Sequence, residues 1–120
     1  MLIDDNRIDN FINRKLLQVS NFAEQFFVME SGREALTHLQ TAPVLPNVIL
    51  LDVQMPEMDG FAFLDALDAL NDPRLDHICL YMLSSSIDQD DLRRARRSDR
   101  VRMFLSKPLN PRELLRDFSA

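Results

Sequence analysis

The chain has only one cysteine, no long apolar run and no excess of positive charge. Each of these absences argues against one kind of protein. The single Cys79 has no second cysteine to pair with and lies in an apolar run, so we expect a small buried hydrophobic residue there. No apolar stretch approaches the ~20 residues of a membrane-spanning helix, and there is no secretory signal pattern. The formal net charge of -5 disfavours nonspecific binding to nucleic acid. We therefore expect a cytoplasmic protein that binds neither membranes nor, directly, nucleic acid.

The length of 120 residues, with 46% of them hydrophobic, fits one globular domain. Short apolar runs of strand length alternate with amphipathic stretches of helix length. Strands are expected at residues 1–3, about 25–29, 48–51, 78–83 and 103–105. The third run is apolar throughout, which is typical of a central strand covered on both faces. The first is unusually short, so we expect a domain over residues 1–120 whose first strand is truncated at its start.

Five amphipathic stretches predict helices between and after these strands. They are expected after Asn6, from Ser31, after Asp59-Gly60, from Ser86 (with Gln89 in the capping-box position) and from Asn110. In the first, helical spacing places five apolar residues on one face: Ile8, Phe11, Ile12, Leu16 and Val19. The alternation of strand and helix predicts an α/β fold with parallel strands joined by helical crossovers.

Charged residues follow three of the predicted strands. Asp4 and Asp5 follow the first, Asp52 the third, and Lys107 the fifth. The carboxyl ends of parallel strands form the edge where ligands bind in open sheets. Three carboxylates this close would repel one another unless one is protonated or a cation binds, and Mg²⁺ prefers such hard oxygen ligands. Taken alone, Asp4-Asp5 is equally well explained as a solvated turn, but its convergence with Asp52 and Lys107 favours a magnesium site.

The position of Asp52 at a strand end suits covalent chemistry. A carboxylate can attack phosphorus and form an acyl phosphate. Lys107 would supply an ammonium for the phosphoryl oxygens, and Ser84 a hydroxyl. An ordinary turn residue remains the simpler interpretation of Ser84 taken alone.

Four motifs, in this order and spacing, together resemble the receiver domain of bacterial response regulators over essentially the whole chain. They are Ile3-Asp4-Asp5-Asn6, the run 50–60 (LLDVQMPEMDG), Met82-Leu83-Ser84-Ser85-Ser86, and Phe104-Leu105-Ser106-Lys107-Pro108. The resemblance implies a doubly wound, five-stranded parallel sheet of order 2-1-3-4-5 in a flavodoxin-like three-layer α/β/α sandwich.

The resemblance also implies roles for individual residues. Asp52 would be phosphorylated by a histidine kinase or a histidine phosphotransfer protein. Mg²⁺ would be bound by Asp5, Asp52 and the backbone carbonyl of Gln54, with Asp4 acting through a metal-bound water. Lys107 would contact the phosphoryl group. Ser84, in place of the commoner Thr, would move toward that group as Phe104, in place of the commoner Tyr, turns inward.

Such a protein would be a phosphoacceptor in a two-component phosphorelay rather than a turnover enzyme. Its output surface would comprise the helix after Ser86, the strand 103–105 and the helix after Asn110, facing an unidentified downstream protein; homodimerisation stays open. Six arginines fall between Arg93 and Arg102, and they are explained either by a salt-bridged helix end or by a basic docking patch.

Two alternatives remain. One is a phosphatase or phosphotransferase that forms an aspartyl phosphate, although Gln54 stands where such enzymes have a second Asp. The other is a degenerate receiver that only binds a partner.

Overall fold

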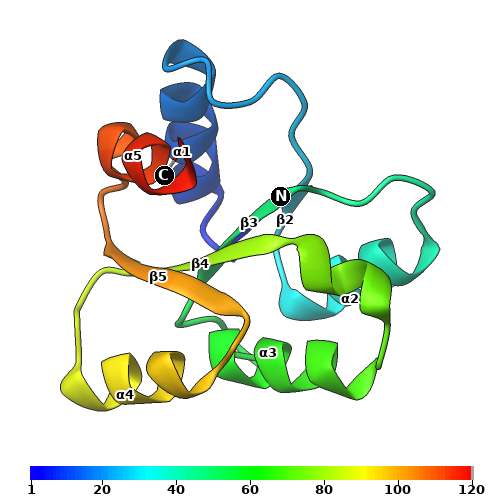
Figure 1. The fold of residues 1–120 in the computed structure, drawn as a ribbon. Helices are drawn as coiled ribbons and strands as arrows, with labels where there is room; N and C mark the ends of the chain where they lie inside the picture. The colour runs from blue at the N-terminus through cyan, green and yellow to red at the C-terminus, as the bar shows by residue number, and fades with distance from the viewer. Residues whose placement is uncertain (120) are drawn as a thin grey trace.

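The computed structural model of the chain describes residues 1–119 and contains one five-stranded parallel sheet. Its strands are β1 (Leu2–Ile3), β2 (Val28–Met29), β3 (Val48–Asp52), β4 (Cys79–Ser84) and β5 (Val101–Ser106). Their order is β2-β1-β3-β4-β5 (Figure 1), which confirms the predicted order. Among the described residues no helix is both long and apolar enough to cross a membrane.

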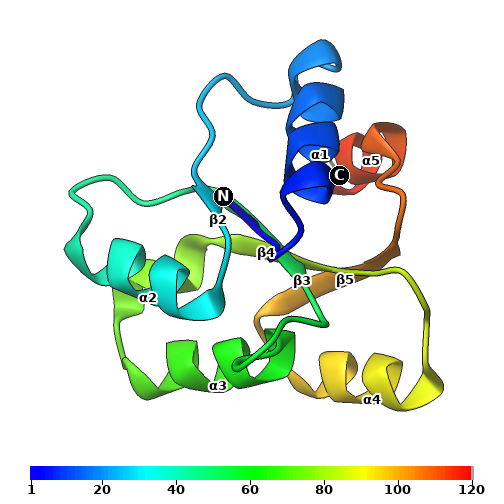
Figure 2. The same ribbon diagram turned by 180° about the vertical axis from the view of Figure 1, so that it is seen from behind.

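Helices cover both faces of the sheet and complete the predicted three-layer α/β/α sandwich. The helices are α1 (Arg7–Val19), α2 (Gly32–Thr41), α3 (Gly60–Ala69), α4 (Gln89–Arg97) and α5 (Pro111–Ser119). Figures 1 and 2 show α1 and α5 on one face and α2, α3 and α4 on the other. Each face has its own apolar core: Phe63 and Leu67 of α3 belong to one, and Leu17 of α1 and Leu114 of α5 to the other.

Side-chain caps fix the starts of the helices, as the sequence predicts for most of them. Asn6 accepts bonds from the backbone N–H groups of Ile8 and Asp9, and Ser31 accepts one from Glu34. Asp59 accepts one from Ala62 at the start of α3. Because these caps are local in sequence, they could be found without the fold.

The predicted start of α4 at Ser86 is wrong. The helix begins at Gln89, and Asp88 is its cap, accepting a bond from the Asp90 N–H at 2.7 Å. Ser86 is instead held in the turn after β4, where its N–H donates to the hydroxyl of Ser84 and its carbonyl accepts from that hydroxyl. A 3₁₀ helix, Pro73–His77, precedes β4 and was not predicted from the sequence.

The strand bounds also differ from the predicted ones. The segment 25–27 precedes β2 without joining it, and β5 begins two residues earlier than predicted and ends at Ser106. Cys79 is half-buried rather than fully buried, and packs against the core beneath α1 and α5.

The apolar face of α1 points into solvent. Ile8, Phe11 and Val19 are 69%, 62% and 82% exposed, whereas Asn10 and Asn13 are buried. The buried side of α1 thus includes polar side chains near the start of the helix. One of them, Asn10, donates a hydrogen bond from its side-chain amide to the Asp4 carbonyl at 2.8 Å. The periodicity correctly predicted one apolar face, but only Leu16 of that face packs against the core.

Candidate functional site

The sheet topology brings the predicted site residues to one edge. Asp4 follows β1, Asp52 ends β3, Ser84 ends β4 and Lys107 follows β5. The register is continuous there: Ile3 lies beside Leu51, Asp52 beside Leu83, and Ser84 beside Ser106. The Lys107 N–H donates to the Ser84 carbonyl at 2.8 Å. Segments far apart in the chain, up to 103 residues for Asp4 and Lys107, therefore meet because parallel strands end together.

Three carboxylates form an oxygen cluster at this edge. Asp4 and Asp52 are buried, at 3% and 6% exposure, and Asp5 is exposed beside them. One carboxylate oxygen from each lies within 4.8 Å of the other two. Hard oxygens converging at this spacing, two of them buried, suit Mg²⁺, which keeps several waters when it binds carboxylates.

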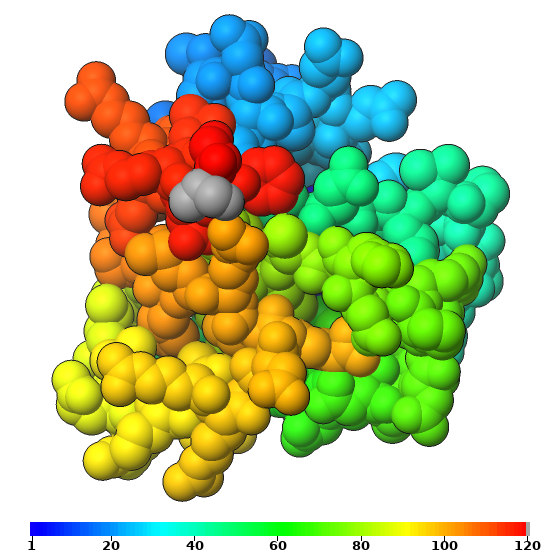
Figure 3. Space-filling model, viewed as in Figure 1, coloured from blue at the N-terminus to red at the C-terminus, as the bar shows by residue number. Residues whose placement is uncertain are grey.

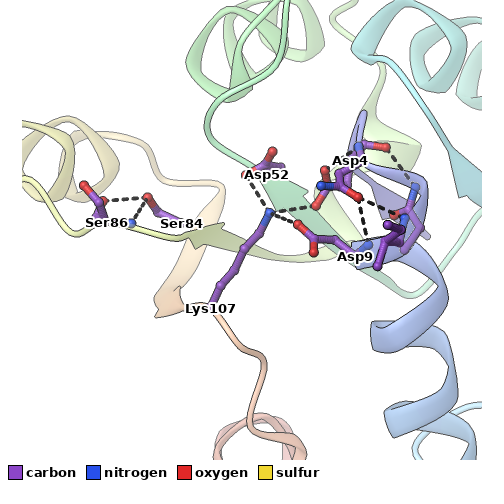
Figure 4. Close-up of polar contacts among 9 residues, drawn as sticks. Asp4, Asp9, Asp52, Ser84, Ser86 and Lys107 are labelled. Atoms are coloured by element: carbon purple, nitrogen blue, oxygen red, sulfur yellow. Dashed lines mark hydrogen bonds and ion pairs between the residues drawn. The ribbon is translucent and has the colours of Figure 1, made fainter.

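The ammonium of Lys107 lies among the acids. Its Nζ is 2.8 Å from Asp4 Oδ2 and 3.3 Å from Asp52 Oδ1, and Figure 4 shows the side chain extending between them. The structure thus brings together Lys107, Asp4 and Asp52, the central expectation drawn from the sequence.

A further carboxylate, Asp9, was missed by the sequence reasoning. It lies in the first turn of α1, and its Oδ2 accepts a bond from Lys107 Nζ at 3.0 Å (Figure 4). An acid in a first helical turn is ordinarily explained by the helix dipole, so its type alone gave no signal. The available signal was its spacing of four residues from Asp5, one helical turn from the acidic edge.

Asp4, Asp5, Asp9, Asp52 and Lys107 form an acidic pocket. Burial and neighbouring charge in this pocket raise the pKa of Asp52. Burial is the largest cause and the charge of Asp4 the next, and together they raise the pKa of Asp52 to about 6 against the opposing effects of Lys107 and the Gln54 backbone amide. Burial alone would lower the pKa of Lys107, but its bonds to Asp4 and Asp9 outweigh burial and raise it well above its usual value. Lys107 is therefore a permanent cation here.

The two predicted switch residues do not contact Asp52 in this structure. The Ser84 hydroxyl is buried and donates to the Ser86 carbonyl at 2.6 Å; Figure 4 shows it directed toward Ser86 and away from Asp52. Phe104 on β5 is half-buried and packs against the core beneath α3. Gln54 is exposed and lies in the loop after Asp52.

Gly60 holds the start of α3 against the end of β3. A Cβ there would lie 2.7 Å from the Asp52 carbonyl oxygen and 2.9 Å from Met82 Cε. The Gly60 N–H donates to the Val53 carbonyl at 2.8 Å. Only glycine permits this approach, which fixes the backbone that carries Asp52.

The comparison with protein families shows the family to which the chain belongs. The sequence model of the response regulator receiver domain matches residues 1–119. The chain belongs to the response regulator receiver family. It is thus a receiver domain of the kind found in two-component systems.

Individual relatives agree with this assignment. The chain is 30% identical over 120 residues to a probable methanogenesis regulatory protein, FilR2, of Methanothrix harundinacea, covering 97% of this chain and 76% of that protein. A crystal structure of a two-component response regulator from Cytophaga hutchinsonii superposes with a TM-score of 0.91 at 30% identity, covering 98% of this chain and 91% of that one. The Mn²⁺-bound form of response regulator Rcp1 superposes with a TM-score of 0.76 at 26% identity, covering 96% and 84%; the same protein is known from a Synechocystis species.

Proposed function

We propose that this receiver domain accepts a phosphoryl group on Asp52 from a phosphohistidine, in a reaction that depends on Mg²⁺. The observation that carries the proposal is the position of Lys107 Nζ, 3.3 Å from Asp52 Oδ1 and beside the three-carboxylate cluster. A cation and a metal-binding oxygen set gathered around one carboxylate suit the transfer of an anionic phosphoryl group.

The transfer balances with the groups in the pocket. An oxygen of the ionised Asp52 attacks phosphorus, an O–P bond forms, and the P–N bond of the phosphohistidine breaks with its electron pair returning to the imidazole nitrogen. The pKa of Asp52, about 6, leaves most of this carboxyl ionised at neutral pH. Lys107 holds its proton throughout and neutralises charge on the phosphoryl oxygens.

A divalent metal fits the residues present. Asp5, Asp52 and the Gln54 carbonyl would hold it, and Asp4 would act through a bound water. When bound, Mg²⁺ would supply charge neutralisation for the phosphoryl oxygens and for the crowded carboxylates. The Mn²⁺-bound form of the related Rcp1 supports a metal at this acidic pocket.

The signal would leave through α4, β5 and α5, which form one continuous surface along one side of the molecule (Figure 3). Phosphorylation would draw the Ser84 hydroxyl away from Ser86 and let Phe104 turn inward, changing this surface for a downstream protein. The Tyr81 hydroxyl of β4 donates to Asp117 of α5 at 2.7 Å, and Arg102 of β5 donates to the same oxygen at 2.6 Å. These bonds join β4, β5 and α5, so a shift in one of these three elements would reach the other two.

Both interpretations of the arginines on this surface find support. Arg93 pairs with Asp90 and Arg100 pairs with Asp68, as in a salt-bridged helix end. Arg96 and Arg97 are exposed and have no ion-pair partner among residues 1–119. We propose that these two contribute a basic rim to the output surface.

The phosphodonor would be a protein, a histidine kinase or a histidine phosphotransfer protein. The exposed apolar face of α1 supports this, since α1 begins at the pocket and Ile8, Phe11, Ile12 and Val19 are all exposed. A partner helix covering this face would reach the acidic edge. We further propose a cytoplasmic location and a phosphoacceptor rather than a turnover phosphatase, whose usual second Asp is replaced by Gln54.

The proposal is tested by incubating the purified protein with radiolabelled acetyl phosphate, with Mg²⁺ or with EDTA. We expect label only with Mg²⁺ and none in Asp52→Asn. Asp65→Asn, an exposed acid on α3, is the matched control and should label like the wild type. Label that persists in Asp52→Asn, or steady turnover of assorted phosphomonoesters, would argue against the proposal.

A further inference from the structure

We propose that Asp9 is a positioning residue: it draws the Lys107 ammonium partly off Asp52 and so keeps an Asp52 oxygen free to attack phosphorus. This inference rests on the proposed phosphoacceptor function. It assigns a role to a carboxylate that lies outside the oxygen cluster formed by Asp4, Asp5 and Asp52.

The Asp9 carboxylate is directed at Lys107. Among residues 1–119, Lys107 is the only side chain to which it is joined by a hydrogen bond or ion pair. Its backbone N–H is fixed by the Asn6 side chain at 3.2 Å, in the first turn of α1. The first turn of α1 therefore holds this carboxylate beside the Lys107 ammonium, as Figure 4 shows.

The distances around Lys107 Nζ are unequal. The short bonds, 2.8 and 3.0 Å, go to Asp4 and Asp9, whereas Asp52 Oδ1 lies at 3.3 Å. A charge-assisted N–H···O bond is usually about 2.7–2.9 Å long. The nucleophile thus has the weakest hold on the ammonium, although it is nearly as buried as Asp4.

Loss of the Asp9 charge would change this division. The ammonium would then be shared by Asp4 and Asp52 alone and would move onto Asp52 Oδ1. A lone pair tied up in a short ionic bond is a poorer nucleophile, so the transfer would slow. If the ammonium stayed in place, removal of the negative charge would instead speed the transfer, because a less negative pocket attracts an anionic phosphodonor better. The sign of the rate change therefore separates positioning from general electrostatics.

The first test compares acetyl phosphate labelling rates at a Mg²⁺ concentration saturating for each variant. We expect Asp9→Asn to slow labelling by about threefold or more, and Asp9→Glu, which keeps a carboxylate, to recover most of the rate. Glu30→Gln removes the same charge at the same sheet edge without touching Lys107, because Glu30 pairs with Arg7. It should leave the rate unchanged or raise it. An unchanged or faster rate in Asp9→Asn would overturn the proposal.

The second test is a double-mutant cycle with Lys107→Met. If Asp9 acts through Lys107, Asp9→Asn has no further effect on the labelling rate in the Lys107→Met background. An undiminished slowing in that background shows that Asp9 acts by another route and contradicts the proposal.

The third test needs no phosphorylation and so separates this inference from the proposed function. In the metal-free protein, NMR couplings across hydrogen bonds should join Lys107 15Nζ to the side-chain 13Cγ of Asp9, and in Asp9→Asn to that of Asp52. Their presence in a protein that acetyl phosphate fails to label would reject the function and keep the Asp9 contact. A wild-type protein that labels but shows no Lys107–Asp9 coupling would reject the positioning role alone.

Discussion

At the residue scale, the site places the ammonium of Lys107, which is half-buried, against the buried carboxylate of Asp52. Burial and the charge of Asp4 destabilise the anionic form of Asp52, and Lys107 offsets this only in part. The pKa of Asp52 therefore rises to about 6. The pocket is therefore over-supplied with negative charge in the absence of a metal. A divalent cation bound here, as we propose, would relieve this unfavourable energy.

The raised pKa of Asp52 predicts a pH dependence of stability. Its folded pKa of about 6 lies above the ordinary value of 3.8, so the folded protein holds the extra proton between these pH values. The free energy of unfolding therefore falls as pH rises through this window and stays reduced above it. In EDTA at pH 7.5, Asp52→Asn should be more stable than the wild type by about 3 kcal/mol. At pH 4 the difference should nearly vanish.

This pH dependence is measured by urea unfolding followed by circular dichroism, since the chain has no tryptophan. Asp65→Asn controls for the loss of one acid on an exposed surface. An Asp52→Asn protein that is no more stable than the wild type at pH 7.5 would contradict the burial argument.

The residues of the pocket were largely predictable from the sequence. Asp4, Asp52 and Lys107 each follow an apolar run, and the rule that parallel strands end together brings them to one edge. Asp9 could not be assigned in the same way, because its contact with Lys107 depends on where α1 leaves the sheet. The orientation of the Ser84 hydroxyl was also unpredictable, since it depends on the local turn to Ser86.

At the element scale, close contacts fix each functional strand end. The start of α3 lies against the end of β3 at Gly60, and Lys107 is bonded through its backbone to the Ser84 carbonyl. Backbone packing thus fixes the positions from which the side chains of the acidic site extend.

Gly60→Ala should disturb both stability and function. The new Cβ would lie 2.7 Å from the Asp52 carbonyl oxygen, a backbone atom that cannot move aside cheaply. We expect a loss of about 2 kcal/mol in the free energy of unfolding and slower labelling of Asp52 by acetyl phosphate.

Gly32→Ala is the matched control for this prediction. Its Cβ would meet Met58 Sδ at 2.8 Å, near the end of a flexible side chain that can turn away. We expect a smaller loss of stability and normal labelling. Equal losses in the two variants would show that the approach at Gly60 has no special role.

Helix starts were easier to predict than helix faces. A cap involves residues two or three apart, so the helix starts at Asn6 and Ser31 were identified from sequence alone. Which side of α1 is buried depends on contacts with distant segments, including the bond from Asn10 to the Asp4 carbonyl. Periodicity gives one apolar face but does not say whether the protein or a partner covers it.

At the scale of the whole molecule, the exposed apolar face of α1 is distinct from the proposed output surface of α4, β5 and α5. Figures 1 and 2 show α1 beside α5 on one face of the sheet and α4 on the other. A donor could occupy the α1 face without covering the output surface. The proposed phosphoryl transfer and the proposed output would then use different faces of the molecule.

Phe11→Asp tests the role of the α1 face. Phe11 is 62% exposed, so its replacement should change the free energy of unfolding by no more than about 0.5 kcal/mol. We expect transfer from autophosphorylated histidine kinases of the source organism to fall about tenfold or more, and acetyl phosphate labelling to stay within about twofold.

Val44→Asp is the matched control, because Val44 is 64% exposed and lies in the loop between α2 and β3. It should leave both donors unaffected. Equal slowing with kinase and with acetyl phosphate in Phe11→Asp would place its effect in the pocket rather than in docking.

The most direct measurement of the central claim is to locate the phosphoryl group. The protein is treated with acetyl phosphate and Mg²⁺, then with sodium borohydride, which reduces an aspartyl phosphate to homoserine, and its peptides are examined by mass spectrometry. We expect homoserine at position 52, and only when acetyl phosphate and Mg²⁺ were both present before the reduction. Homoserine at Asp4, Asp5 or Asp9 instead, or at none of the acids, would contradict this expectation.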